Sequence, residues 1–116
     1  MWIFTQDGFI SAVDNNEVPG KIAVRARDKR SLAFLAEITS QDIKQVAGRD
    51  YPYRVYVTKA EFTEFVASHI ESIDYANFKD QVKTIRGRDF ASACGSVWEA
   101  MLDVTDNEAL GTGLYA

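Results

Sequence analysis

The sequence predicts an α+β fold, in which a mainly antiparallel sheet of four strands carries helices packed on it, in the order β-β-β-α-β-α-α-α. Two observations favour this class. Three strand-like segments joined by short connections open the chain, as in an antiparallel meander. The remainder has apolar residues mostly at helical spacing with one further strand-like segment, and lacks the regular alternation of strand and helix of a parallel α/β sheet.

The first three strands are predicted over residues 1–5, 9–13 and 21–27. Asp7-Gly8 between the first two is a strong hairpin signal, because glycine accepts the positive φ that tight turns require. In the third strand the side chains alternate between the two faces of the sheet. The set expected to face the core is Ile22, Val24 and Ala26, and the opposite set is Lys21, Ala23, Arg25 and Arg27.

The first two strands are apolar on both faces. The residues concerned are Trp2, Ile3, Phe4, Phe9 and Ile10. Such strands fit a central place in the sheet, a cover formed by the C-terminal helices, or a cover formed by a second copy of the chain.

The middle of the chain is expected to supply a helix, a short helical turn and the fourth strand. The helix begins at about Lys29, with Asp28 as a natural N-cap. A short second turn of helix is expected over residues 43–47. The fourth strand follows over residues 53–57, with Pro52 at its first position or on an edge.

The clearest helix lies over residues 58–73. Thr58 and Glu61 have the spacing of a capping box. The apolar stripe is Phe62, Phe65, Val66, Ile70 and Ile73. His69 lies on or beside this stripe, and we interpret it as part of the clamp between helix and sheet.

Two further helices complete the predicted fold. Asp74 and Asp89 are natural N-caps for them. The first has Tyr75, Phe78, Val82 and Ile85 at helical spacing, and the second has Phe90, Cys94, Val97, Trp98 and Met101. Gly95 within the last helix suggests close packing by another helix. We expect one domain over residues 1–103 and a flexible tail over residues 104–116.

Composition indicates a soluble, cytoplasmic protein. The chain has 116 residues, no apolar run near the roughly 20 residues that span a bilayer, and no basic leader. Its single cysteine excludes an internal disulfide. The net charge of −4 comes from the second half, where residues 59–116 carry five Lys or Arg against ten Asp or Glu. An acidic chain is a poor polyanion binder, whereas the acidic half suits a basic partner, if it does not simply keep the helices soluble.

Catalytic, metal and cofactor motifs are missing from the sequence. One histidine and one cysteine do not make a metal site, and we predict no cofactor and no catalytic residues. A nucleophilic pair of His69 and Cys94 is an alternative, but a buried thiol and a hydrogen-bonded helix histidine are the favoured interpretation.

A basic and aromatic patch is the most interesting predicted surface. If the third and fourth strands are neighbours, Arg25, Arg27, Arg54 and Tyr56 share one face. Arginine presents a planar fork suited to carboxylates or phosphates, and tyrosine offers a stacking surface. RNA-binding sheets use such surfaces, although their paired aromatic motif is missing here. The alternative is a solvated face on which Arg25 or Arg27 is paired with Asp or Glu.

Several segments of the sequence are similar to segments of other proteins. They are Met1–Thr5, Gly8–Val13, Val24–Asp28, Tyr53–Val55 and Ile73–Lys79. In these segments, which span most of the first 80 residues, the chain resembles a group of small uncharacterised bacterial and phage proteins. The resemblance implies a small cytoplasmic protein and no transferable activity. The candidate positions it implies are Trp2, Arg25, Arg27, Asp74, Tyr75 and Asn77.

Three functions remain open on this basis. The favoured one is a small, non-enzymatic binding or regulatory module that acts through a protein partner, one version being a phage-encoded inhibitor of a host defence complex. The second is a nucleic-acid or nucleotide binder that uses the patch of Arg25, Arg27, Arg54 and Tyr56. The third is an enzyme with Asp74, Tyr75 or His69 in a pocket. Nothing suggests a membrane partner, and a homo-oligomer is left open.

Overall fold

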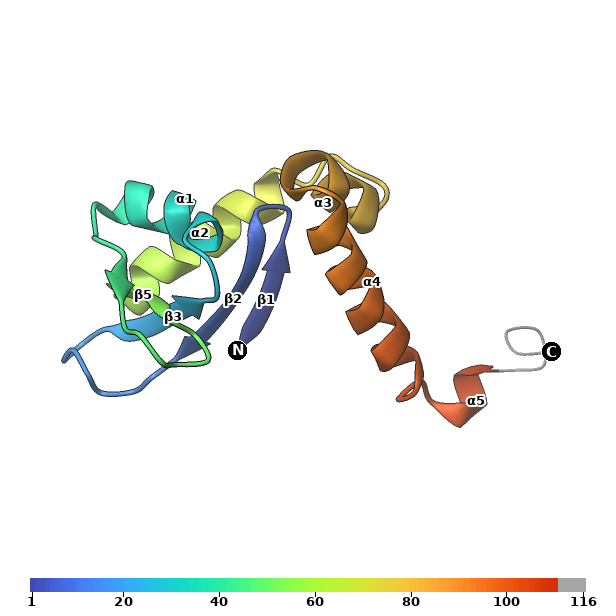
Figure 1. Cartoon of the computed structure of the whole chain (residues 1–116), viewed down its shortest axis with the longest axis horizontal. Coiled ribbons are helices and arrows are strands. Elements are labelled where there is room, and N and C mark those ends of the chain that lie inside the picture. Colours follow the sequence, from blue (N-terminus) through green and yellow to red (C-terminus); the bar gives the residue numbers. More distant parts are fainter. Residues whose placement is uncertain (111–116) are drawn as a thin grey trace. The chain divides into compact units, whose positions relative to one another are not determined.

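The structure, a computed structural model, describes residues 1–110 and confirms an α+β fold with an antiparallel sheet (Figure 1). Its elements are β1 (Trp2–Thr5), β2 (Gly8–Val13), β3 (Ile22–Ala26), α1 (Arg30–Thr39), β4 (Lys44–Gln45), β5 (Tyr53–Val57), α2 (Lys59–Glu71), α3 (Phe78–Arg86), α4 (Arg88–Leu102) and α5 (Asn107–Leu110).

The chain divides into two compact units, Met1–Ala76 and Asn77–Ala116, and each is described by itself. The single domain expected over residues 1–103 therefore stays a prediction. Of the tail expected over residues 104–116, α5 occupies Asn107–Leu110, and residues 111–116 lie outside the described residues.

The sheet has five strands within the described residues, not the predicted four, in the order β1-β2-β3-β5-β4 with every pair antiparallel. The additional strand, β4, lies where a helical turn was predicted over residues 43–47. Lys44 pairs with Arg54 there, and the backbone N–H of Val46 donates to the carbonyl of Pro52 at 2.7 Å. The segment over residues 43–47 is too short for the spacing of its apolar residues to specify a helix. Its backbone groups form hydrogen bonds by pairing with the outer edge of β5.

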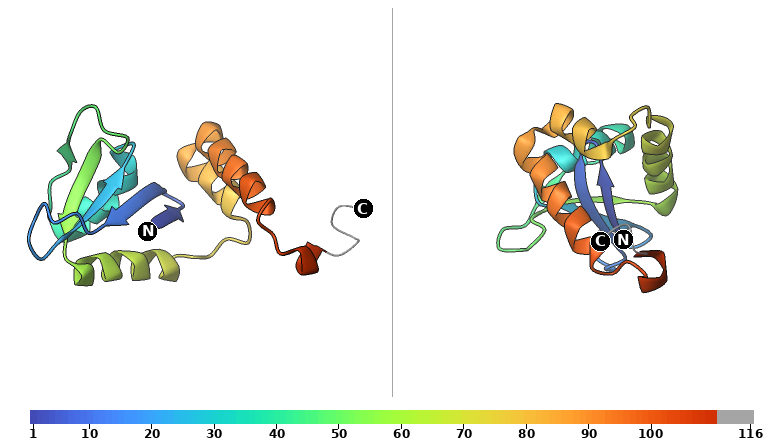
Figure 2. Two further views of the ribbon diagram at one scale, coloured as in Figure 1. Left: turned by 90° about the horizontal axis from the view of Figure 1, so that it is seen from below. Right: turned by 90° about the vertical axis from the view of Figure 1, so that its right-hand side faces the viewer.

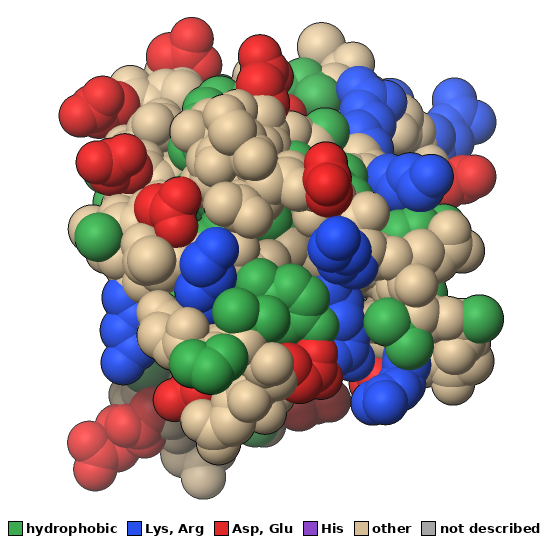
Figure 3. Space-filling model, turned by 90° about the vertical axis from the view of Figure 1, so that its left-hand side faces the viewer, with side chains coloured by type: hydrophobic (Ala, Val, Ile, Leu, Met, Phe, Trp, Pro, Cys, Tyr) green, Lys and Arg blue, Asp and Glu red, His purple; other side chains and the backbone are tan. Residues whose placement is uncertain are grey.

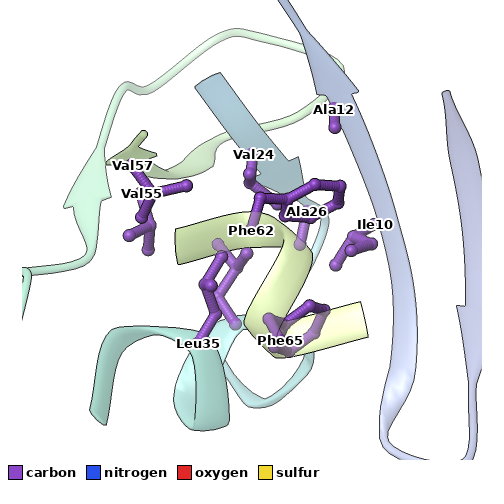
Figure 4. Close-up of a cluster of buried hydrophobic side chains, with 10 residues drawn as sticks. Ile10, Ala12, Val24, Ala26, Leu35, Val55, Val57, Phe62 and Phe65 are labelled. Atoms are coloured by element: carbon purple, nitrogen blue, oxygen red, sulfur yellow. The ribbon is translucent and has the colours of Figure 1, made fainter. Parts of the chain in front are cut away.

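The core lies between one face of the sheet and helices α1 and α2. Figure 4 shows side chains from β2, β3, β5 and both helices pointing toward one another. The alternation predicted for the third strand is confirmed, because Val24 and Ala26 belong to the core cluster and Ile22 packs against it, whereas Ala23 is buried outside that cluster. Each buried side chain of the size of valine or phenylalanine stabilises the fold by about 1.5–3 kcal/mol.

Helix α2 begins with the predicted capping box. The hydroxyl of Thr58 accepts from the backbone N–H of Glu61 at 3.1 Å, and a carboxylate oxygen of Glu61 accepts from the backbone N–H of Thr58 at 2.8 Å. Phe62 and Phe65 are buried as predicted, but Ile70 and Ile73 are exposed. That part of the predicted stripe is wrong: α2 ends at Glu71, before Ile73, and both isoleucines line an open cavity beside β1 instead of packing in the core.

The second unit contains a pair of helices, α3 and α4, which lie side by side (Figure 2). Asn77, not the predicted Asp74, caps α3, since its side chain accepts from the backbone N–H of Asp80 at 3.1 Å. Val82 and Cys94 are the buried side chains of the pair. Gly87, with φ of 93°, separates the two helices in a backbone conformation that favours glycine.

Within residues 1–110, no helix has both the length and the apolar character that crossing a membrane would require.

Candidate functional site

The face of the sheet opposite α1 and α2 carries a row of polar side chains. Across the row, Arg25 of β3 pairs with Ser11 of β2 on one side and with Arg54 of β5 on the other, and Arg54 pairs in turn with Lys44 of β4. Residues directly opposite one another in an antiparallel sheet share a face. The predicted neighbourhood of the third and fourth strands, with Arg25, Arg54 and Tyr56 on one face, is thus observed.

Tyr51 covers part of this face and holds two arginines. The guanidinium of Arg25 lies 4.7 Å from the centre of the Tyr51 ring and that of Arg27 lies 4.8 Å from it, while the tyrosine is only 5% exposed. Arg25 also donates to the hydroxyl of Ser11 at 2.8 Å, and Arg27 to the carbonyl of Asp50 at 3.3 Å. These contacts position both guanidinium groups, and Arg27 remains exposed.

A carboxylate from the loop between β2 and β3 engages the other half of the predicted patch. Glu17 accepts from Arg54 at 2.8 Å, and its second oxygen accepts from the hydroxyl of Tyr56. Arg54 is only 4% exposed, and its Nε has no hydrogen-bond partner among the described residues. The hydrogen bond from Tyr56, followed by the charge of Arg54, lowers the pKa of Glu17. Burial, and then the bond to Glu17, raises the pKa of Tyr56.

The predicted patch is therefore mostly engaged in contacts within the chain. Arg54 and Tyr56 are tied to Glu17, and Arg25 is held between Ser11 and Tyr51. Figure 3 shows Lys and Arg side chains around hydrophobic ones on the side of the molecule that carries β5, with several Asp and Glu side chains apart from them at the upper left. The contacts of Glu17 and Tyr51 were missed from the sequence, since both residues lie in loops without a pattern.

Asp74 and Tyr75 lie elsewhere, in the segment between α2 and α3. Asp74 is exposed, and Tyr75 is half-buried. Tyr75 and His69 line a cavity of about 140 Å³ together with Thr5 of β1, and Asp74 is not among its lining residues. The structure thus separates these two candidates from the arginines, and brings one of them next to the histidine.

His69 is packed as part of the clamp between α2 and the core. Its ring meets Phe65 and Phe34 edge to face, at centroid distances of 4.7 and 5.7 Å. Its Nε2 lies 3.8 Å from a carboxylate oxygen of Asp7. Burial lowers the pKa of His69, and the charge of Asp7 opposes that shift only in part. These contacts support a structural role, but Nε2 does not make the expected hydrogen bond, since it has no hydrogen-bond partner among the described residues.

Cys94 lies in the second unit, where burial raises the pKa of its thiol. A neutral thiol is a weak nucleophile. Within residues 1–110, His, Cys, Asp and Glu form no group of three or more that could hold a metal ion.

A surface that we call the aromatic edge lies at the other end of the sheet and consists of Trp2, Phe4 and Phe9. Trp2 is 71% exposed, and its ring meets that of Phe9 edge to face at 5.9 Å. Phe9 in turn stacks on Phe4 at 4.5 Å and lies 6.0 Å from the guanidinium of Arg27. Strand β1 is an edge strand rather than a central one, so its outer edge has no neighbouring strand among the described residues; Trp2 is exposed there, and Phe4 and Phe9 are half-buried.

Comparison of the chain with protein-family models, with curated proteins and with solved structures gave no match. The surfaces described above are thus the basis on which a function can be inferred.

Proposed function

We propose that this chain is a small, non-enzymatic binding module that acts through a protein partner, and that the partner docks on the aromatic edge. The observation that carries the proposal is the exposure of Trp2, a large side chain held in place by Phe9 on a strand without an outer neighbour in residues 1–110. Tryptophan and arginine dominate the binding energy of protein interfaces. A phage-encoded inhibitor of a host defence complex would be one protein of this class.

The backbone of β1 supports docking of an extended segment. The backbone nitrogen and carbonyl of Met1 both bond to Ala12 at 2.8 Å. Hydrogen-bonded pairs alternate along an antiparallel ladder, so the next such pair is Ile3 with Ile10. The N–H and C=O groups of Trp2 and Phe4 then point away from β2. A partner segment can add here as a further strand, with Trp2 as its side-chain contact.

Arg27 gives this docking surface a positive rim. Its guanidinium lies against Phe9 and Tyr51, and it is exposed. A guanidinium held in this way is suited to a carboxylate. The segment that fits is therefore extended and apolar, with an acidic side chain beside its apolar residues.

The first test is capture of a partner from bacterial lysate by the tagged chain, followed by an affinity measurement with the identified partner. Trp2→Ala is expected to weaken binding by about 30-fold, because truncation of an interface tryptophan removes about 2 kcal/mol or more. The matched control is Ile38→Ala, which shortens an exposed apolar side chain on α1 and leaves binding unchanged. Failure to capture a stoichiometric partner, or equal binding by the Trp2 and Ile38 variants, would contradict the proposal.

A second candidate function is binding of single-stranded nucleic acid. The stacked group of Arg25, Tyr51 and Arg27, continued by Phe9, is the observation that favours it, since bases stack on such surfaces. The net charge of −4 and the engagement of Arg54 by Glu17 disfavour it. Fluorescence anisotropy with single-stranded oligonucleotides at low salt tests it. Binding is expected to be lost in Arg25→Ala with Arg27→Ala, and no binding by the wild type at low salt removes this candidate.

A further inference from the structure

Helix α4 has two apolar faces. One packs along α3, whereas the other meets α3 at Phe90, whose ring lies 4.3 Å from the guanidinium of Arg86. The face toward α3 includes the buried Cys94 and also Gly95, whose position adjoins the side chain of Lys79. The second face, which we call the α4 seam, consists of Phe90, Ala93, Val97, Ala100 and Val104. Ala93, Val97, Ala100 and Val104 are exposed, with Val97 at 40% and Val104 at 70%.

The spacing of the α4 seam is that of a helix–helix interface. Its residues follow one another at intervals of three, four, three and four along the chain. This alternation keeps one apolar line facing a partner helix, as at the a and d positions of a coiled coil. Val104 follows the end of α4, in a turn where its backbone N–H donates to the carbonyl of Met101 at 3.3 Å. The seam thus offers the side chains needed to receive one helix.

The charges beside the α4 seam decide which helix fits. Asp89, Ser96 and Asp103 recur every seven residues and so line one side of the seam. From residue 89 to the last residue, the sequence has five carboxylates and no Lys or Arg. An antiparallel second copy would place Asp89 against Asp103, which brings like charges together. An anionic lipid surface is repelled for the same reason.

We infer that the α4 seam binds a basic, amphipathic helix of a partner protein. Apolar residues of that helix pack on Val97 and its neighbours, and its Lys or Arg side chains pair with Asp89 and Asp103. This surface differs from the aromatic edge, which receives an extended segment. The inference therefore stands whether or not Trp2 contributes to binding.

The test uses the full chain and two designed helical peptides with the same leucine seam, one flanked by lysine and the other by glutamate. Anisotropy of the labelled peptides is expected to show binding of the lysine peptide alone. Val97→Gln, which makes the seam polar at an exposed site without adding charge, is expected to weaken that binding at least about tenfold. Ser92→Gln, at an exposed site off the seam, is the matched control and leaves binding unchanged.

The contribution of the acidic residues beside the α4 seam is tested by measuring peptide binding at different salt concentrations. Asp89→Asn with Asp103→Asn is expected to weaken binding of the lysine peptide at low salt and to reduce its dependence on salt concentration. Circular dichroism checks that each variant keeps its helices. The inference is overturned if the lysine peptide does not bind, if Val97→Gln binds it as the wild type does, or if the glutamate peptide binds equally. A second copy of the chain is the partner instead if the wild type alone sediments as a dimer and the Val97→Gln variant sediments as a monomer.

Discussion

Arg54 shows how one contact changes the chemistry of a surface. On the sequence alone it belongs to an open basic patch with Arg25 and Arg27. In the structure it is nearly buried and bonded to Glu17, so its charge is compensated within the chain. A buried arginine that is paired in this way contributes little to the field outside the protein. The polarity of the open face therefore depends on a glutamate in a loop, 37 residues away along the chain.

His69 is the residue whose protonation is expected to affect stability near neutral pH. Burial holds its pKa below the ordinary value of 6.5 in the folded chain. The unfolded chain therefore binds a proton at a higher pH than the folded chain, and protonation favours unfolding. Stability should fall as the pH drops below about 6.5, and this contribution should level off below the folded pKa.

Urea unfolding of the wild type and of His69→Gln at about pH 7.5 and about pH 5 measures this contribution. The wild type should lose more stability between these values than the variant, which has no imidazole to protonate. Glu17 and Glu61, whose pKa values are lowered, affect stability in a more acidic range. Equal pH dependence of the two proteins over this interval would show that His69 does not couple protonation to folding.

At the scale of elements, the stability of α2 depends on the capping of its N-terminus. Its capping box satisfies two backbone N–H groups that have no partner within the helix, and its first two turns place Phe62 and Phe65 in the core. Fixing the first turn also fixes where these rings lie relative to β5, since Thr58 directly follows that strand.

Removal of the cap is expected to cost stability without changing the fold. Thr58→Ala should lower the free energy of unfolding by about 1 kcal/mol, because the N–H of Glu61 loses its acceptor. Thr58→Ser keeps a hydroxyl at the same position and should retain most of the stability. Urea denaturation of the three proteins measures the difference. If the serine and alanine variants were equally destabilised, the hydroxyl would not be the source of the effect.

At the scale of the whole molecule, the sequence predicted what depends on local pattern. The meander, the alternation in β3 and the capping box of α2 follow from residues close together in the chain. The strand β4 could not be predicted from local pattern, because its two residues form a strand only by pairing with β5. The contact of Tyr51 with two arginines is likewise a contact between distant segments.

The candidate site shows the same division. Strand alternation correctly placed Arg25, Arg54 and Tyr56 on one face, but it carries no information on whether a loop covers that face. The exposure of Ile70 was missed because periodicity does not show whether a neighbouring element covers a side chain; Ile70 lines an open cavity beside β1. Local patterns thus give the orientation of a side chain, whereas its partners depend on the tertiary fold.

The bond between Glu17 and Arg54 also constrains how this sequence can change over generations. Loss of Glu17 alone leaves a buried cation without its counterion, and loss of Arg54 alone leaves Tyr56 as the one remaining donor to the carboxylate among residues 1–110. Each single replacement therefore produces a less stable protein, whereas simultaneous replacement of both residues by apolar ones can preserve the fold. Among related sequences, these two positions should consequently vary together, although one lies in a loop and the other in a strand.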